Sequence, residues 1–212
     1  MQLFRSILSR RMLALILCAV LIYVNAFTSV KVFAKVCTNQ PAFRCTANKQ
    51  AEADQAHNND LAITAKAAVL IDNASGRILY AKNKDKKLIP ASITKIMTLL
   101  LIFESIEQGK CKLEDNVTVS EYAASMGGSQ VFLEPGETQD VNTMIKCISI
   151  ASANDAAVAM AEHLAGSEQS FVKRMNKKAK ALGMKHTHFK NCNGLDDSIE
   201  SGHYSSAYDV AL

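Results

Sequence analysis

The chain contains no tryptophan, and aromatic residues make up only 6% of its 212 residues. This scarcity argues against a surface that binds sugars or nucleic-acid bases by stacking them on aromatic rings. Apolar residues make up 49% of the chain, which is enough for a hydrophobic core. The length suits one domain with a leader and a linker rather than two full domains. No internal repeat is visible.

The sequence also lacks a comfortable membrane span, which needs about 20 apolar residues. Its uninterrupted apolar run covers only residues 12–24, after a basic start and before small-residue sites at 24–26 and 32–34. This order is typical of a secretory signal peptide. We therefore predict a signal peptide over residues 1–34, cut after Ala34, and an exported protein. An uncleaved N-terminal anchor is the alternative.

Without the predicted leader, the chain has no excess of charge of either sign. The whole chain has 24 basic and 20 acidic residues, a net charge of +4. The leader holds four of the basic residues and no acidic one (Arg5, Arg10, Arg11 and Lys31), so 24 − 4 leaves 20 of each sign. The basic isoelectric point therefore belongs to the leader and gives no support for nucleic-acid binding.

Cysteine spacing gives no sign of a metal site or a disulfide framework. Cys18 lies in the leader, and five cysteines remain, namely Cys37, Cys45, Cys111, Cys147 and Cys192. An odd number without C-x-x-C spacing indicates neither zinc nor a framework. A Cys37–Cys45 pair stays open as an alternative. It would lie in residues 35–65, a polar, aperiodic stretch predicted to be a flexible linker. Cys147 is expected to be a small buried hydrophobe.

Residues 66–212 are predicted to form a mixed α/β (α+β) domain that combines an antiparallel sheet with a helical block. Turn chemistry at residues 73–76 separates two β-prone stretches and predicts a hairpin over 67–82. Residues 117–119 are expected to be a short strand. Helices are predicted over residues 92–108, 143–151, 155–164 and 167–182. Because Ile96 to Ile102 is apolar nearly all round, the first helix is expected to be buried centrally.

The sharpest chemical signal is the pair Ser92 and Lys95 at the start of the first helix. Positions i and i+3 share a helix face, so the hydroxyl and the amine can meet. A lysine beside a buried apolar stretch loses solvation, which lowers its pKa. Such a lysine can deprotonate a serine and make it a nucleophile. The alternative is an N-cap serine followed by a surface lysine.

A second signal is Ser152-Ala153-Asn154, in the predicted turn between two apolar helices. A serine and an asparagine at i and i+2 of a short turn can point into one cleft. The serine could relay a proton, and the amide could hold a substrate carbonyl or the lysine. The alternative is helix capping, because Ser152, Asn154 and Asp155 are all good N-cap residues.

Together the two motifs resemble those of the serine penicillin-recognising hydrolases. The segment Pro90-Ala91-Ser92-Ile93-Thr94-Lys95-Ile96-Met97-Thr98 is similar to the nucleophile segment of D-alanyl-D-alanine carboxypeptidases. Five further blocks resemble that family in order, at residues 127–129, 133–137, 151–156, 193–196 and 203–209. The resemblance covers about residues 66–212 and implies a DD-peptidase/β-lactamase-like serine hydrolase domain.

The resemblance implies a serine-type D-Ala-D-Ala carboxypeptidase that acts on peptidoglycan stem peptides through an acyl-enzyme. Ser92 would be the nucleophile and Lys95 the general base. Ser152 would carry a proton to the leaving amine, and Asn154 would hold the substrate amide. β-Lactams would acylate Ser92. The family implies no metal or cofactor and no nucleic acid, and it implies peripheral association with the membrane or the cell wall on the extracytoplasmic side. Residues 194–196 and the block at 203–209 are expected to be structural.

The sequence departs from the family in one respect, because no Lys-Thr-Gly motif or close variant is present. In the family this motif binds the substrate carboxylate, and a neighbouring N–H completes the oxyanion hole. We expect it to lie past Leu212, so the chain would be the N-terminal portion of the catalytic domain. Loss of one oxyanion donor typically costs about 10²–10³ in rate. We therefore expect residues 35–212 alone not to be labelled stably by fluorescent penicillin.

Two other functions remain as alternatives at this stage. A class A β-lactamase would share both motifs but needs a deacylating glutamate in a loop after the second. Only Glu162 and Glu168 are available between residues 162 and 195, both in predicted helices. A catalytically inactive, wall-associated binding domain would not require intact Ser92, Lys95, Ser152 and Asn154.

Overall fold

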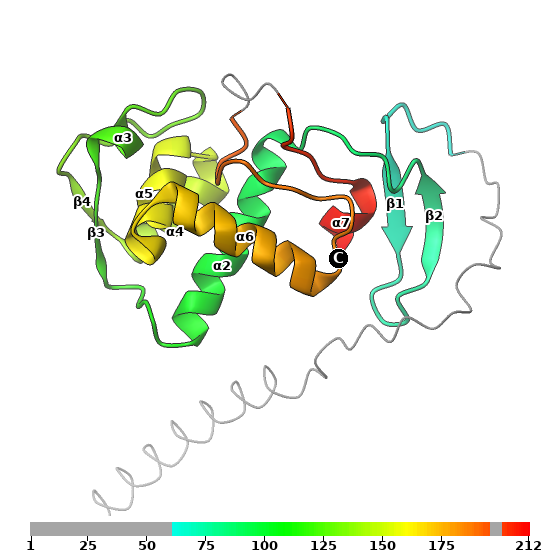
Figure 1. Cartoon of the computed structure of the whole chain (residues 1–212), viewed down its shortest axis with the longest axis horizontal. Coiled ribbons are helices and arrows are strands. Elements are labelled where there is room, and N and C mark those ends of the chain that lie inside the picture. Colours follow the sequence, from blue (N-terminus) through cyan, green and yellow to red (C-terminus); the bar gives the residue numbers. More distant parts are fainter. Residues whose placement is uncertain (1–60, 196–200) are drawn as a thin grey trace, which may run out of the picture. The chain divides into compact units, whose positions relative to one another are not determined.

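The computed structural model describes residues 61–195 and 201–212 (Figure 1). The chain divides into two units, Met1–Asp54 and Gln55–Leu212, and all described residues belong to the second. The predicted signal peptide, most of the predicted linker and the Cys37–Cys45 pair lie outside the described residues, as does Asp196. Those expectations therefore stay predictions.

The predicted hairpin is confirmed. Strand β1 (Ala68–Ile71) pairs antiparallel with β2 (Ile78–Lys82), with Ala68 opposite Lys82. The turn between them is held by the Asp72 carboxylate, which accepts a hydrogen bond from the Ser75 N–H at 2.9 Å. This is an Asx-type turn, the local chemistry that the residues between the strands predicted.

The helices follow the prediction closely, and three short elements were missed. A 3-10 turn η1 (Ala91–Thr94) runs directly into α2 (Lys95–Glu107). Then come β3 (Asn116–Thr118), α3 (Glu121–Ala124), β4 (Thr138–Asp140), α4 (Val141–Ala151), α5 (Asn154–Ala165), α6 (Glu168–Leu182) and α7 (Ala207–Ala211). β3 pairs antiparallel with β4. The short elements η1, α3 and β4 had not been expected as such, and α4 begins at Val141, two residues earlier than predicted.

Helix caps explain where two of these helices begin. The Asp140 carboxylate accepts from the Thr143 N–H at the start of α4, and the Ser167 hydroxyl accepts from the Ser170 N–H at the start of α6. Such caps satisfy N–H groups that have no partner within the helix. Because Asp140 also ends β4, α4 follows that strand without a loop.

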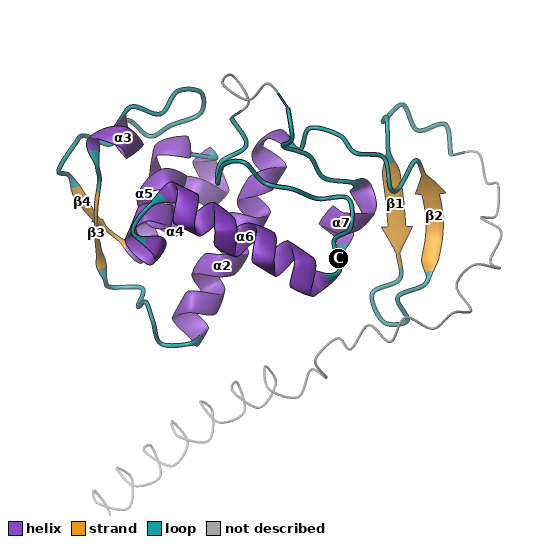
Figure 2. Ribbon diagram, viewed as in Figure 1, coloured by secondary structure: helices purple, strands orange, loops and turns teal. Residues whose placement is uncertain are grey.

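Helix α5 lies at the centre of the described core, although α2 had been predicted to take that position. Its residues from Asn154 to Ala161 are all buried, and it contacts α2, α3, α4, α6 and β3. Four of those eight residues are alanines, whose small side chains let neighbouring helices approach from several sides. Figure 2 shows the resulting helical block between the β3–β4 pair at one end and the β1–β2 hairpin at the other.

The expectation that α2 is buried all round is wrong for the described residues. Ile96 and Phe103 are 58% and 51% exposed, while Met97, Thr98 and Ile102 face the core. An apolar groove of about 280 Å³ runs along the exposed face, lined by Ile93, Ile96, Leu100, Leu182 and Val210 among others. The physical reason is that one face of α2 has no packing partner among the described elements.

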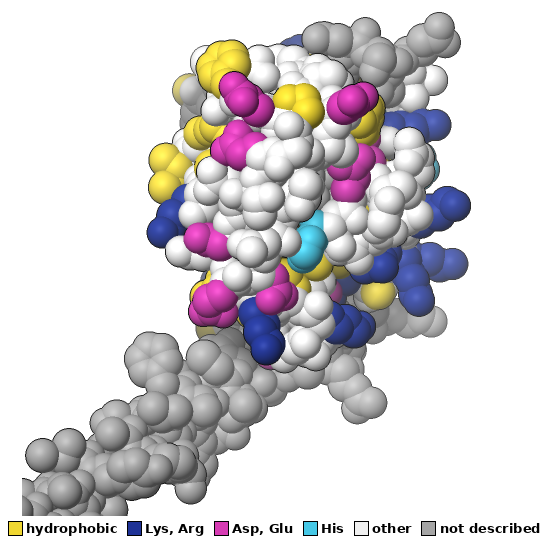
Figure 3. Space-filling model, turned by 90° about the vertical axis from the view of Figure 1, so that its left-hand side faces the viewer, with side chains coloured by type: hydrophobic (Ala, Val, Ile, Leu, Met, Phe, Trp, Pro, Cys, Tyr) yellow, Lys and Arg dark blue, Asp and Glu magenta, His cyan; other side chains and the backbone are white. Residues whose placement is uncertain are grey.

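The β3–β4 end of this unit carries charges of both signs. Acidic side chains are spread across the face in Figure 3, and basic ones lie mainly toward its right-hand and lower parts. Neither sign covers this face, so it offers no basic patch of the kind that binds nucleic acid. Among residues 61–195 and 201–212, no helix is long and apolar enough to cross a bilayer.

Candidate active site

The proposed nucleophile lies on a tightly bent turn. Ala91 has a φ of 45°, a conformation that residues other than glycine rarely adopt, and Ser92 follows it in the 3-10 turn η1. The Ile93 N–H donates to the Pro90 carbonyl at 3.1 Å and closes the turn. Ser92 itself is exposed. The bend therefore presents the Ser92 hydroxyl at the surface, one turn ahead of the buried side of α2.

Lys95 lies directly beneath that hydroxyl. Its side chain is buried, with 3% exposure, and Nζ donates to Ser92 Oγ at 3.3 Å and to the Asn193 carbonyl at 2.8 Å. Burial lowers the pKa of Lys95 from 10.5 to about 8, and nearby Cys192 opposes this shift in part. No carboxylate among the described residues forms a salt bridge with it. The predicted meeting of hydroxyl and amine is therefore confirmed as geometry.

A loop that sequence reasoning treated as structural holds Lys95 in place. The Thr98 hydroxyl of α2 donates to the Cys192 carbonyl at 2.5 Å, one residue before the carbonyl that accepts from Lys95. Gly194 then lies so close to the nucleophile turn that an added Cβ would be 1.8 Å from the Ala91 carbonyl oxygen. The loop at residues 192–194 is thus in contact with both Ser92's turn and Lys95.

Glu168 anchors this loop from the first turn of α6. Its buried carboxylate accepts from the Cys192 N–H at 3.0 Å and from the Tyr122 hydroxyl at 2.7 Å. The hydrogen bond to Glu168 raises the pKa of Tyr122 well above its ordinary value. With both oxygens engaged by structural donors, Glu168 has the contacts of a positioning residue and not those of a deacylating base. This removes one of the two glutamates on which the β-lactamase alternative depended.

The block at residues 203–209 also contacts the nucleophile turn. His203 Nε2 lies 2.8 Å from Thr94 Oγ1, and the Leu88 backbone pairs with that of Ser205. The Asp209 carboxylate accepts from the His186 N–H and from the Thr187 hydroxyl. The loop at residues 192–194 and the block at residues 203–209 therefore both directly contact the turn that holds Ser92. Their motif likeness was visible in the sequence, but nothing local indicated these contacts.

Ser152 and Asn154 lie where the second motif placed them, between α4 and α5. Ser152 ends α4 in the left-handed conformation with a φ of 56°, and the N-cap position of α5 is taken by Ala153 with no side-chain bond. The Asn154 amide donates to the Gly127 carbonyl, and the Asp155 carboxylate accepts from the N–H groups of Val131 and Leu133 and from that of the next residue, Ala156, so none of these side chains fills the N-cap position. The capping alternative for α5 is therefore wrong.

No hydrogen bond among the described residues joins the second motif to the first. No described residue forms a side-chain hydrogen bond with Ser152, and the amide of Asn154 donates only to Gly127, at 2.8 Å. Asn154 is buried and starts α5, which packs against α2. Its backbone N–H donates to Ser129 at 2.7 Å. The pair Ser92–Lys95 is thus assembled in the structure, and the roles of Ser152 and Asn154 stay predictions.

Comparisons with known proteins point to one family. A family model described as D-alanyl-D-alanine carboxypeptidase matches residues 50–212. The chain is 59% identical over 162 residues to the D-alanyl-D-alanine carboxypeptidase DacF of Bacillus subtilis, covering 76% of this chain and 41% of that protein.

Solved structures agree with this comparison. The crystal structure of the D-alanyl-D-alanine carboxypeptidase DacD from Francisella tularensis has a TM-score of 0.67 at 38% identity, over 70% of this chain and 35% of that one. Penicillin-binding protein D2 from Listeria monocytogenes, in an ampicillin-bound form, has a TM-score of 0.63 at 28% identity, over 72% and 60%. The chain thus spans about two-fifths of the length of the curated relative it matches.

Proposed function

Since this chain belongs to the D-alanyl-D-alanine carboxypeptidase family, we propose that it provides the nucleophile and the base of a serine-type D-Ala-D-Ala carboxypeptidase. The observation that carries the proposal is the buried amine of Lys95, 3.3 Å from the Ser92 hydroxyl and held by the Asn193 carbonyl. A lysine with a pKa near 8 is partly neutral at physiological pH, as a general base must be.

In the first step, Ser92 Oγ attacks the carbonyl carbon of the D-Ala-D-Ala bond while Lys95 Nζ takes the hydroxyl proton. The C–N bond of the resulting tetrahedral species then breaks, and the terminal D-alanine leaves as a neutral amine after it gains a proton. We assign the transfer of that proton to Ser152, whose hydroxyl has no partner among the described residues: it donates its own proton to the leaving nitrogen and regains one from the Lys95 ammonium, which returns to the neutral amine. Water hydrolyses the ester of Ser92 in the second step and restores the enzyme.

Asn154 is proposed to hold the amide of the bound stem peptide. Its side-chain nitrogen is engaged by Gly127, and no described residue donates to its side-chain oxygen. An amide oxygen without a donor can accept a hydrogen bond from a substrate N–H, which fixes the peptide relative to Ser92. A methyl group at Gly128 would lie 2.9 Å from that amide nitrogen, so the loop packs closely on it.

The substrate class, inhibitors and location follow from the same proposal. We propose that the substrates are peptidoglycan stem peptides and that β-lactams acylate Ser92. We also propose that the protein acts on the extracytoplasmic side of the membrane or in the cell wall. Support for the location comes from the basic, apolar and small-residue order of residues 1–34. Support for the inhibitors comes from the ampicillin-bound relative.

The test uses the full-length gene product. It is incubated with a synthetic peptide ending in D-Ala-D-Ala, and released D-alanine is measured. We expect release of D-alanine together with slow, stoichiometric acylation by nitrocefin. Rapid nitrocefin turnover without D-alanine release would favour the β-lactamase alternative. A product with neither activity would favour an inactive wall-binding domain.

The pH dependence of acylation should report Lys95. Because the pKa of Lys95 is lowered to about 8, the amine is mostly protonated below pH 8 and cannot accept the Ser92 proton. The second-order rate of penicillin acylation is therefore expected to rise about tenfold per pH unit up to about pH 8 and then level off. Stopped-flow measurements with a fluorescent penicillin check this. A rate that rises with the same slope up to pH 10 would show that the group that accepts the Ser92 proton has a pKa near 10 or above, and would contradict a Lys95 base with a pKa near 8.

A further inference from the structure

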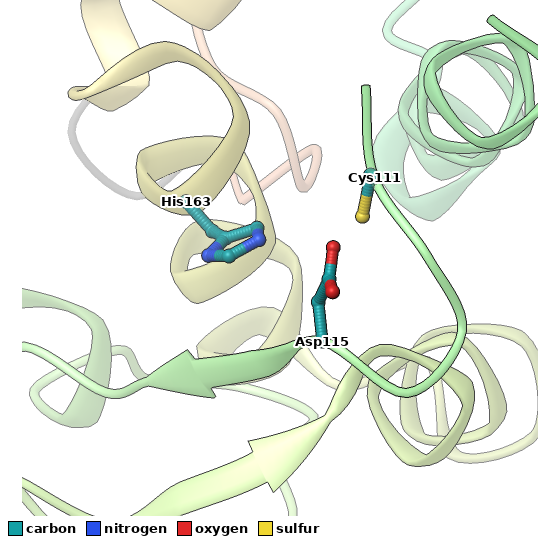
Figure 4. A group of neighbouring side chains, drawn as sticks. All are labelled: Cys111, Asp115 and His163. Atoms are coloured by element: carbon teal, nitrogen blue, oxygen red, sulfur yellow. The ribbon is translucent and has the colours of Figure 1, made fainter. Parts of the chain in front are cut away.

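Three potential metal ligands meet at the opposite end of the helical block from Ser92. Cys111 and Asp115 lie in the loop between α2 and β3, and His163 lies in the last turn of α5. One ligand atom from each of the three lies within 4.8 Å of the others. Figure 4 shows the Cys111 sulfur, the Asp115 carboxylate and the His163 ring facing the same small space. The proposed reaction uses none of these residues.

We propose that Cys111, Asp115 and His163 bind a divalent transition metal, with Zn²⁺ as the best match. Thiolate, imidazole and carboxylate are the ligands that zinc takes in proteins, at about 2.0–2.3 Å from the ion. In a tetrahedral site, such ligand atoms lie about 3.5 Å apart, so the cluster must close by about 1 Å through side-chain rotation. With three protein ligands, water takes the fourth position.

The loop that carries two of the ligands is built to bring them together. The Asp115 N–H donates to the Lys112 carbonyl at 3.2 Å, and the Lys112 N–H donates to Asp115 Oδ2 at 2.8 Å. These two bonds close a tight turn directly after Cys111 and leave Asp115 Oδ1 without a donor among the described residues. The ordered turn fixes one ligand relative to the other before a metal arrives, which reduces the entropy lost on binding.

Burial gives the cluster an inner and an outer side. The Cys111 side chain is 1% exposed, whereas His163 is exposed and Asp115 is half-buried. A metal ion can therefore approach from the His163 side and reach a sulfur that is shielded from solvent. The spacing of these residues along the sequence did not predict a metal site, because His163 comes from a separate helix and C-x-x-C spacing concerns only neighbouring residues.

The position of the cluster suggests what the metal would do. Lys95 starts α2, and Asn154 starts α5, whereas Cys111 follows the end of α2 and His163 lies in the last turn of α5. At a rise of about 1.5 Å per residue, the cluster lies roughly 18 Å or more from Lys95 along α2 and roughly 14 Å from Asn154 along α5. A bound ion would tie the far ends of the two helices that carry Lys95 and Asn154. We therefore expect a structural contribution, with no direct part in acylation.

The test measures metal binding directly and uses the full chain. Cys18, Cys37 and Cys45 are replaced by serine. The number of ions bound per chain then depends only on the remaining cysteines, Cys111, Cys147 and Cys192. Zn²⁺ affinity is measured by competition with a chromophoric chelator, and Co²⁺ is added separately to look for a thiolate-to-cobalt charge-transfer band. We expect one ion per chain and a higher unfolding temperature with Zn²⁺. His163→Gln should weaken binding more than about 100-fold, since even supporting residues around a metal cost 10–100-fold.

Matched variants separate this site from adventitious binding. Cys111→Ser should remove the cobalt charge-transfer band, whereas Cys147→Ser, which changes a cysteine of α4, should keep it. His186→Gln, which changes a histidine outside the cluster, should keep full affinity. If Cys111→Ser does not fold, the exposed His163→Gln still decides the matter. Absence of stoichiometric binding, or binding that His163→Gln leaves unchanged, would overturn the proposal.

Discussion

Replacing Ser92 by alanine is expected to abolish the covalent penicillin adduct of the full-length gene product. The adduct is an ester of the serine oxygen, and alanine has no atom that could form it. Lys95 would keep its bond to the Asn193 carbonyl, so the site should stay assembled without its nucleophile. Intact-protein mass spectrometry after penicillin treatment checks this, with a mass increase of one penicillin in the native protein and none in Ser92→Ala.

The control is another exposed serine on a helix. Ser149 lies on α4 with an exposed hydroxyl that bonds only weakly to the Lys146 carbonyl, at 3.5 Å. Ser149→Ala should form the adduct at the native rate. Because Ser92 is also exposed, neither substitution should change the thermal unfolding temperature by more than about 2 °C. An adduct of unchanged mass on Ser92→Ala would move the nucleophile to another residue and end the proposed mechanism.

Much of the fold could be predicted because its signals are local. The turn at Asp72–Arg77, the cap at Ser167 and the glycine at 183 each mark an element boundary through bonds between near neighbours. Strand β4 and helix α3 were missed because three or four residues are too few to show a period. Their boundaries depend on pairing with β3 and on packing against α5, which no single segment reveals.

The error about α2 has a different cause. An apolar stretch such as Ile96 to Ile102 predicts burial somewhere, but it does not say which neighbours supply it. In the described residues the central position belongs to α5, whose alanines reduce its width, and α2 keeps Ile96 and Phe103 exposed. Composition thus predicted that the segment is an apolar helix. Which helix lies at the centre of the core depended on side-chain sizes across several helices.

The candidate site was likewise predictable only in its local part. Ser92 and Lys95 meet because of their spacing on one helical turn, and this was predictable. The low pKa of Lys95 requires the loop at residues 192–194 to cover it, and that loop is brought there by Glu168 and Thr98. Those contacts join residues far apart in the sequence. Sequence reasoning could therefore predict that Ser92 and Lys95 meet, but not which residues bury and orient the lysine.

Gly194→Ala should test how far the nucleophile depends on this loop. The added Cβ would lie 1.8 Å from the Ala91 carbonyl oxygen and 3.0 Å from the Ser92 nitrogen, and both are backbone atoms that cannot rotate away. Gly194 also has a φ of +85°, which costs an alanine about 1 kcal/mol. We expect a total loss of about 3 kcal/mol or more in the free energy of unfolding, measured in urea.

Acylation by penicillin should fall by about 10² in the same variant, because displacing a reacting group by about 1 Å costs that much. Gly136→Ala is the matched control, since Gly136 has a φ of +82° and open space around its Cβ position. It should lose only the conformational part, about 1 kcal/mol, and acylate at the native rate. The difference between the two variants isolates the contact with Ala91 from backbone strain. Equal rates in both would mean that the turn holding Ser92 is shaped by its own residues, and that the close approach of Gly194 contributes packing without positioning the nucleophile.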